Sequence, residues 1–362
     1  MSFQRQFAFW LAAAALFALA IWVFRDILLP FVAGLVLAYL LDPLADRLQR
    51  LGMGRLLATL LILALFVMIF TVALLLLVPI VVTDLAAFLA KIPDYARQLQ
   101  QLLARYGAPI AERFGGDLPD LQNSLGTFVS RGASWLGDLL TSLWSGGQAL
   151  LGVVSLIVVT PVVAFYLLVD WDHMIATVDG WVPVRSRNTV RELAREINAA
   201  IAGFVRGQAL VCLLLGTWYA VGLTLTGLNF GFLIGLLSGF LTFIPYVGSL
   251  TGLVLATGVA IVQFWPDPVM IGLVLAVFFS GQFLEGNILS PKLVGHAVGL
   301  HPVWLMFALF AFGNMLGFVG LLLAVPLAAT VGVLARFSLR QYLASPLYAG
   351  GPVSSPGPES RS

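Results

Sequence analysis

Long apolar runs without charged residues recur along most of the chain. Residues 56–82 and 149–169 are two such runs, and each supplies the roughly 20 apolar residues that a helix needs to cross a bilayer. The alternation of polar and apolar positions that marks transmembrane β-strands is absent from the sequence. The pattern predicts an all-α polytopic membrane protein, with about eight transmembrane helices, re-entrant or broken elements, and amphipathic extramembrane helices.

Residues 1–82 are predicted to form an N-terminal group of membrane helices over 7–24, 27–41 and 56–82. The second helix is expected to stop at Asp42-Pro43, where a short arginine-rich loop begins. Loops rich in Lys and Arg stay on the cytoplasmic side, so the first pair of helices should cross out and back.

The middle of the chain is more polar. Residues 83–147 are expected to be extracytoplasmic, and their helical spacing of apolar residues predicts amphipathic helices that lie on the membrane or against a neighbouring subunit. A membrane helix over 148–169 should end at Asp170-Trp171-Asp172, interpreted as a helix stop or interfacial anchor. An amphipathic helix over 170–207 follows, and its arginines favour the cytoplasm.

Residues 208–340 are predicted to form a C-terminal membrane core with broken helices, and 341–362 a disordered tail. If every apolar run of this core crossed, the chain would end outside, yet Arg336 and Arg340 favour an inside C-terminus. One run should therefore fail to span. The shortest, 230–244, would be about 22 Å long as a helix, and 285–302 is the alternative irregular element. The runs are 209–225, 230–244, 247–264, 269–284 and 303–334.

Composition narrows the function classes. Of 362 residues, 60% are hydrophobic and 10% charged, against about 25% charged in a soluble domain. The net charge of +2 comes from scattered arginines, so no nucleic-acid partner is expected. Cys212 is the only cysteine, which excludes an internal disulfide. Because zinc-helix, nucleophile-elbow and phosphate-loop motifs are absent, we expect no enzyme activity, no metal and no cofactor.

Polar residues interrupt the apolar pattern most sharply at 282–302. An ionisable group at membrane depth is costly unless it is paired or lines a cavity, so this stretch is the main candidate for an ion or substrate pathway. Glu285, beside Gln282 and Asn287, could bind a cation or carry a proton, with the basic residues after it as charge partners or gate residues. An ordinary loop at headgroup level is the alternative. The polar and backbone-breaking residues are Gln282, Glu285, Asn287, Pro291, Lys292, His296 and His301.

A second polar break, without charge, lies at 242–249. It could expose backbone oxygens to a substrate or serve only as a hinge. Asn314, flanked by glycines, could add a polar group, although such glycines more often permit close helix packing. A glycine with a proline about ten residues later recurs in 235–245 and 317–326, which could be a diverged repeat. The residues assigned to the pathway from this break are Pro245, Tyr246 and Gly248.

Several motifs in a fixed order carry a resemblance. They are Pro30-Phe31 leading to Leu37-Ala38-Tyr39-Leu40-Leu41-Asp42-Pro43 and Arg55, then Phe243-Ile244-Pro245-Tyr246-Val247-Gly248, Glu285-Gly286-Asn287-Ile288-Leu289-Ser290-Pro291-Lys292, Gly299-Leu300-His301-Pro302, and 317–326. The sequence resembles the AI-2E family of transporters, the PerM-like bacterial inner-membrane proteins, from about residue 25 to residue 339.

The resemblance implies a secondary transporter that assembles as a homo-oligomer, a pentamer. Members are associated with export of the quorum-sensing signal autoinducer-2 or with sodium/proton antiport, and their transport region maps onto 244–248 and 285–302. We expect an exporter of a small polar solute that works by alternating access in the lipid of the inner membrane, with both termini cytoplasmic. A Na⁺(Li⁺)/H⁺ antiporter with Glu285 as its ion site is the alternative. A membrane scaffold that recruits partners through 83–147 is the alternative of another class.

Overall fold

The computed structural model describes residues 12, 16, 19–114, 127, 147–294, 301–345 and 348. In these residues every regular element is a helix, and seven helices are long and apolar enough to cross a membrane. The prediction of an all-α polytopic membrane protein is confirmed. The elements in chain order are η1 (Arg25–Ile27), α2 (Leu28–Arg50), α3 (Arg55–Phe114), α5 (Gly147–Trp181), η2 (Val184–Ser186), α6 (Arg187–Leu225), α7 (Gly231–Leu241), α8 (Val247–Phe264), α9 (Pro268–Leu284), η3 (Glu285–Val294) and α10 (Pro302–Leu343).

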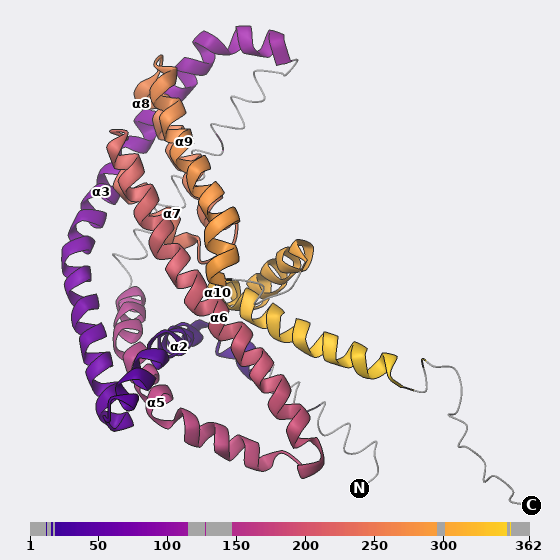
Figure 1. The fold of residues 1–362 in the computed structure, drawn as a ribbon. Coiled ribbons are helices and arrows are strands. Elements are labelled where there is room, and N and C mark those ends of the chain that lie inside the picture. The colour runs from indigo at the N-terminus through magenta and orange to yellow at the C-terminus, as the bar shows by residue number, and fades with distance from the viewer. Residues whose placement is uncertain are drawn as a thin grey trace, which may run out of the picture. The chain divides into compact units, whose positions relative to one another are not determined.

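The chain divides into two compact units. The larger unit comprises Val23–Trp171 and Val205–Val294, and the smaller unit comprises Met1–Trp22, Asp172–Phe204 and Gly295–Ser362. In the larger unit α2 packs on α3, α7 on α8 and α8 on α9, while the long curved α3 contacts α7 and α8 (Figure 1). Many apolar side chains of α3 stay exposed, for example Leu75 at 71%, as suits a surface that faces lipid.

Small residues bring the helices of the larger unit into close contact. A Cβ at Gly235 would meet the backbone of Ala220, and a Cβ at Gly239 would meet the backbone of Gly216. The backbones of α6 and α7 can therefore approach closely where these glycines cross, which is how membrane helices gain packing energy without a hydrophobic effect between them. The core behind this crossing is centred on the fully buried Tyr219.

Helix α2 continues through Asp42-Pro43, so the expected stop there is wrong. A proline inside a helix leaves the carbonyl four residues earlier without its N–H partner. Here that carbonyl belongs to Tyr39, and the Nε of Arg206 donates to its oxygen at 2.8 Å. The proline is tolerated because α6 replaces the missing donor. Likewise α5 continues through Asp170-Trp171-Asp172 to Trp181, so the helix end expected there is also wrong.

Helix α10 is a hairpin rather than one rod, so the apolar run 303–334 is not one continuous span. Gly317 has φ 62° and ψ −137°, a conformation outside the helical region that glycine adopts without strain. A Cβ at Gly320 would strike the carbonyl of Phe312, eight positions earlier, which shows that the chain folds back at Gly317. The turn precedes Pro326, whereas Pro245 lies inside the turn between α7 and α8. The two glycine-proline segments are therefore not structurally equivalent.

Candidate functional site

The Glu285 carboxylate sits where α9 passes into the π-helix η3, and its side chain is half-buried. The Nε2 of Gln282 donates to Glu285 Oε2 at 3.0 Å and to the hydroxyl oxygen of Tyr219 at 3.3 Å. An amide nitrogen carries two hydrogens, so one side chain can make both bonds. The pairing of Gln282 with Glu285 follows the sequence-based expectation, while Tyr219 was missed because it lies in an apolar run.

Packing fixes the Tyr219 end of this chain of hydrogen bonds. The Tyr219 ring stacks on Phe278 with ring centroids 4.6 Å apart, and it fills the space that a Cβ at Gly281 would need. The carboxylate is thus held from α6 through an aromatic residue that is itself immobilised.

Residues 285–302 are the alternative place predicted for an irregular element, and within them η3 is a π-helix from Glu285 to Val294. The Nδ2 of Asn287 donates to the Phe283 carbonyl at 3.1 Å, so this amide satisfies backbone and does not face Glu285. Pro291 and Lys292 are exposed on the second half of the element. π-Helical turns are rare and occur often at functional sites, because they wind an extra residue into a turn.

Helix η3 rests against α6 at Gly207. A Cβ there would meet the backbone carbonyl group of Leu293, so only glycine permits this approach. Leu289, Leu293 and Val294 pack on the core of the larger unit from the same side. The end of η3 is therefore anchored on one turn of α6.

The second break, 242–246, is anchored on the same turn. The Nε2 of Gln208 donates to the Thr242 carbonyl at 2.6 Å, and both residues are buried. A Cβ at Gly248 would collide with Thr242, so the turn closes tightly. Tyr246 has φ 68°, which is strained for a tyrosine, and 51% of it is exposed. Pro245 precedes it in the turn, and the two breaks contact consecutive residues of α6, Gly207 and Gln208.

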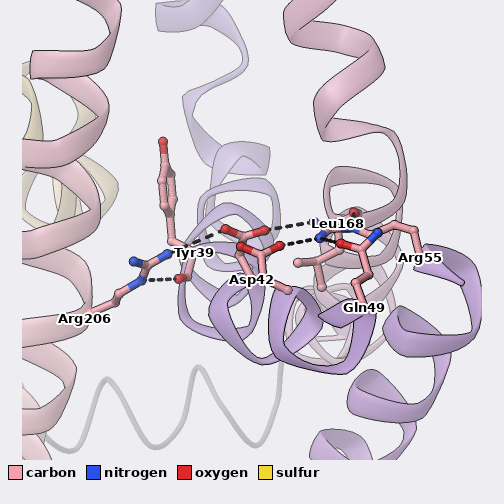
Figure 2. A network of polar contacts seen from close by, with 7 residues as sticks. Tyr39, Asp42, Gln49, Arg55, Leu168 and Arg206 are labelled. Atoms are coloured by element: carbon pink, nitrogen blue, oxygen red, sulfur yellow. Dashed lines mark hydrogen bonds and ion pairs between the residues drawn. The ribbon is translucent and has the colours of Figure 1, made fainter. Parts of the chain in front are cut away.

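One residue earlier on α6, Arg206 joins a polar network between α2, α3 and α5 (Figure 2). Its Nη2 lies 3.7 Å from Asp42 Oδ2, while the other carboxylate oxygen accepts from Arg55 Nη2 at 2.9 Å. Asp42 therefore bridges two arginines. The sequence predicts only a helix stop or an interfacial anchor at Asp42-Pro43, and it gives no signal for Arg206 by itself. The signal that could have found the pair is Pro43, which frees a carbonyl that needs a donor.

The Arg55 guanidinium is the centre of this network (Figure 2). Its Nε donates to the Leu168 carbonyl at 2.7 Å, and its Nη1 donates to Asp46 at 2.7 Å and to Gln49 at 2.9 Å. Only 16% of the Arg55 side chain is exposed, so its charge depends on these partners. The guanidinium thus joins the loop end of α3 to α2 and α5.

The remaining candidates lie in the smaller unit or outside the described residues. His301 is the N-cap of α10, where its Nδ1 accepts from the Val303 N–H at 3.3 Å. Asn314 is exposed on the first arm of α10, close to the turn at Gly317. His296 lies outside the described residues. Within the described part of the chain, no group of three or more His, Cys, Asp or Glu residues could hold a metal ion.

Comparison with known proteins identifies the family. The family model described as AI-2E family transporter matches residues 11–340 of the chain. The chain belongs to the AI-2E transporter family. Together with the long apolar helices, this makes it a multi-pass membrane protein and a membrane transporter.

Individual relatives agree with this assignment. YrrI of Bacillus subtilis (strain 168), named as a transport protein, is 29% identical over 92% of this AI-2E family chain and 97% of its own. PerM of Escherichia coli (strain K12), named as a permease, is 31% identical over 86% of this chain and 87% of its own. The family match over residues 11–340 includes both polar breaks.

Proposed function

We propose that this transporter exports a small polar solute, of the autoinducer-2 type, across the bacterial inner membrane by alternating access. The observation that carries the proposal is that the 242–246 turn and the π-helix η3 contact neighbouring residues of α6, Gln208 and Gly207 respectively. The 242–246 turn frees backbone carbonyl and N–H groups, which at membrane depth only protein or a polar cavity can satisfy, and π-helical turns such as η3 occur often at functional sites. A single turn of α6 therefore couples the two segments that a solute would pass.

Glu285 is the proton or cation site in this proposal. It is the first residue of η3, it is half-buried, and it has Gln282 as a neutral hydrogen-bond donor. A carboxylate with a neutral donor can exchange a proton for a cation without leaving a buried ion pair behind. The same reasoning supports both coupled export and Na⁺(Li⁺)/H⁺ antiport, and the transported species distinguishes them.

The membrane orientation follows the charge pattern. Arginines lie in the last turn of α2 and in the last turn of α10, which supports cytoplasmic positions for these two helix ends and for both ends of the chain. We further propose a homo-oligomer, which the family resemblance supports.

The test is a flux measurement in liposomes that contain the purified protein. A furanone-type signalling molecule, Na⁺, Li⁺ and K⁺ are compared at two pH values for the wild type and for Glu285→Gln. We expect the variant to lose about tenfold in flux of the coupled species, together with the pH dependence of the remaining flux. Glu192→Gln, an exposed change on α6, is the matched control and should behave as the wild type.

Each outcome has a distinct meaning. Flux of the furanone with the expected Glu285 effect supports export, and Na⁺ or Li⁺ flux coupled to protons without furanone flux replaces it with antiport. Unchanged flux and pH dependence in Glu285→Gln would remove Glu285 from the mechanism. Absence of any flux, with partner binding that is lost when 93–132 is deleted, would favour the scaffold.

A further inference from the structure

The smaller unit contains a cavity that the transport site does not use. It lies between the two arms of the α10 hairpin and has a volume of about 580 Å³. Its walls are aromatic and aliphatic, with Trp304, Phe307 and Ala311 from the first arm and Gly332 from the second. Its two polar lining residues are His301 and Arg336. The cavity is thus apolar along its length and basic at one end.

Both polar residues lie at the end of the hairpin away from the turn at Gly317. Arg336 is 3.5 Å and Arg340 3.8 Å from the carboxylate of Glu196. These distances exceed the roughly 2.7–2.9 Å of a charge-assisted hydrogen bond, and two guanidinium groups face one carboxylate. The basic end of the cavity, its mouth, therefore keeps a net positive charge and N–H donors for a further anion.

His301 adds a donor at the same end. Because its Nδ1 accepts from the Val303 N–H, the proton of the neutral ring lies on Nε2. The group that fits this mouth is an oxyanion, and the group that fits the walls is a hydrocarbon chain.

We propose that the α10 cavity binds one acyl chain of an anionic phospholipid, with the headgroup phosphate at Arg336. The volume lies within the range of small-molecule pockets. A single acyl chain alone holds only weakly, so a charge contact is needed for stable occupancy. Basic pockets between membrane helices on the cytoplasmic side are where anionic lipid headgroups bind, and Arg336 and Arg340 favour that side. The proposal does not depend on the transported solute.

A second copy of the chain is a poorer occupant. A helix about 10 Å wide with a 5.4 Å pitch takes up roughly 400 Å³ per turn, so the cavity would hold little more than one turn. A helix would also bring no negative charge to Arg336 unless an acidic side chain happened to lie there.

The test is native mass spectrometry of the purified protein with added lipid. Palmitoyl-oleoyl phosphatidylglycerol, the matching phosphatidylcholine and free palmitate are compared at equal concentration. We expect the wild type to retain phosphatidylglycerol at least fivefold better than phosphatidylcholine, and Arg336→Gln to remove this preference. Ala311→Phe, which fills the cavity, should lose retention of both phospholipids. Arg191→Gln and Leu339→Phe, two changes outside the cavity lining, are the controls.

A second measurement uses the wild-type protein, with the conservative change Trp304→Phe as its reference. Phosphatidylglycerol with a brominated acyl chain, added at one molecule per chain, should quench a fraction of the tryptophan fluorescence that is missing in Trp304→Phe. Equal retention of both phospholipids by the wild type, retention of palmitate alone, or retention of phosphatidylglycerol by a folded Ala311→Phe would each overturn the proposal. A change of oligomer mass in Ala311→Phe with unchanged lipid retention would also overturn it and assign the cavity to a second copy.

Discussion

At the scale of single residues, polar side chains in this protein form hydrogen bonds either to backbone groups that lack a partner or to other polar side chains. Pro43 removes a hydrogen bond from α2, and Arg206 on another helix supplies the missing donor to Tyr39. Gln282 is an example of the second kind, because its side-chain amide donates to both Tyr219 and Glu285. In lipid each unsatisfied backbone group costs several kcal/mol, so such replacements decide which sequences can carry a proline or a polar break.

The hydroxyl of Tyr219 can be removed while its packing is kept. Tyr219→Phe retains the stack on Phe278 but deletes the acceptor of one Gln282 bond. We expect a loss of about 0.5–1.5 kcal/mol in the free energy of unfolding and a shifted pH dependence of flux, because Gln282 is then less fixed beside Glu285. Thermal unfolding and a pH series of liposome flux measure the two effects. Tyr166→Phe, at an exposed tyrosine on α5, should change neither.

The sequence could predict part of the site but not its partners. Glu285 and Gln282 are three positions apart on a helix, so their contact follows from helical geometry. Tyr219 lies 63 positions from Gln282, and Gln208 lies 34 from Thr242. Tyr219 is an isolated polar residue in an apolar stretch and Gln208 stands at the start of one, and only the packing of α6 against α7 and α9 shows what they contact.

At the scale of elements, the arginine network replaces the helix stop that the sequence indicated. Arg55 makes hydrogen bonds to α2 and α5 with three different nitrogen atoms. Such a fork cannot be reproduced by the ammonium group of lysine. The network therefore holds three helices together at one end of the larger unit.

Arg55→Lys tests the network. We expect a loss of about 2–4 kcal/mol in the free energy of unfolding, because the carboxylates of Asp42 and Asp46 and the Leu168 carbonyl lose a shared donor. Chemical denaturation in detergent measures the loss. Arg97→Lys is the control, since its pair with Asp94 is exposed on one helix and contributes little. Equal effects of the two changes would show that the Arg55 network contributes nothing specific.

Gly207→Ala tests the contact between α6 and η3. An added Cβ would strike the Leu293 carbonyl group, so η3 must move away from α6. We expect lower thermal stability and at least tenfold lower flux. Gly258→Ala, in α8 where a Cβ meets nothing within 4 Å, should instead raise stability by about 0.5–1 kcal/mol. A Gly207→Ala protein with wild-type flux would contradict the coupling role of this turn.

At the scale of the whole molecule, hydropathy predicted helix content and membrane class but not every boundary. Apolar runs locate helices reliably because the bilayer leaves few other structures possible. They do not show where the chain reverses direction. The hairpin turn at Gly317 lies inside a single apolar run, because a glycine among apolar residues carries no polar signal. Conversely, the charges of Asp170 and Asp172 predict the end of a helix, but both residues lie inside α5.

Labelling of single cysteines tests the membrane orientation. With Cys212→Ser as background, cysteines replace Arg185, Gln341 and Lys91, three exposed residues. We expect a membrane-impermeant maleimide to label the first two only in inside-out vesicles and the third only from outside, because arginine-rich segments stay cytoplasmic. Labelling of the Gln341 position on intact spheroplasts would place the C-terminal end outside and contradict the proposed topology.

The contacts of Arg206, Gly207 and Gln208 restrict how α6 can move. Consecutive residues point about 100° apart around a helix, so these three meet α2, η3 and the 242–246 turn on different sides of the axis. A small rotation cannot preserve all three contacts, and a partial one would leave a buried carbonyl without its donor. Any rearrangement of this turn should therefore be abrupt, with few molecules in intermediate positions.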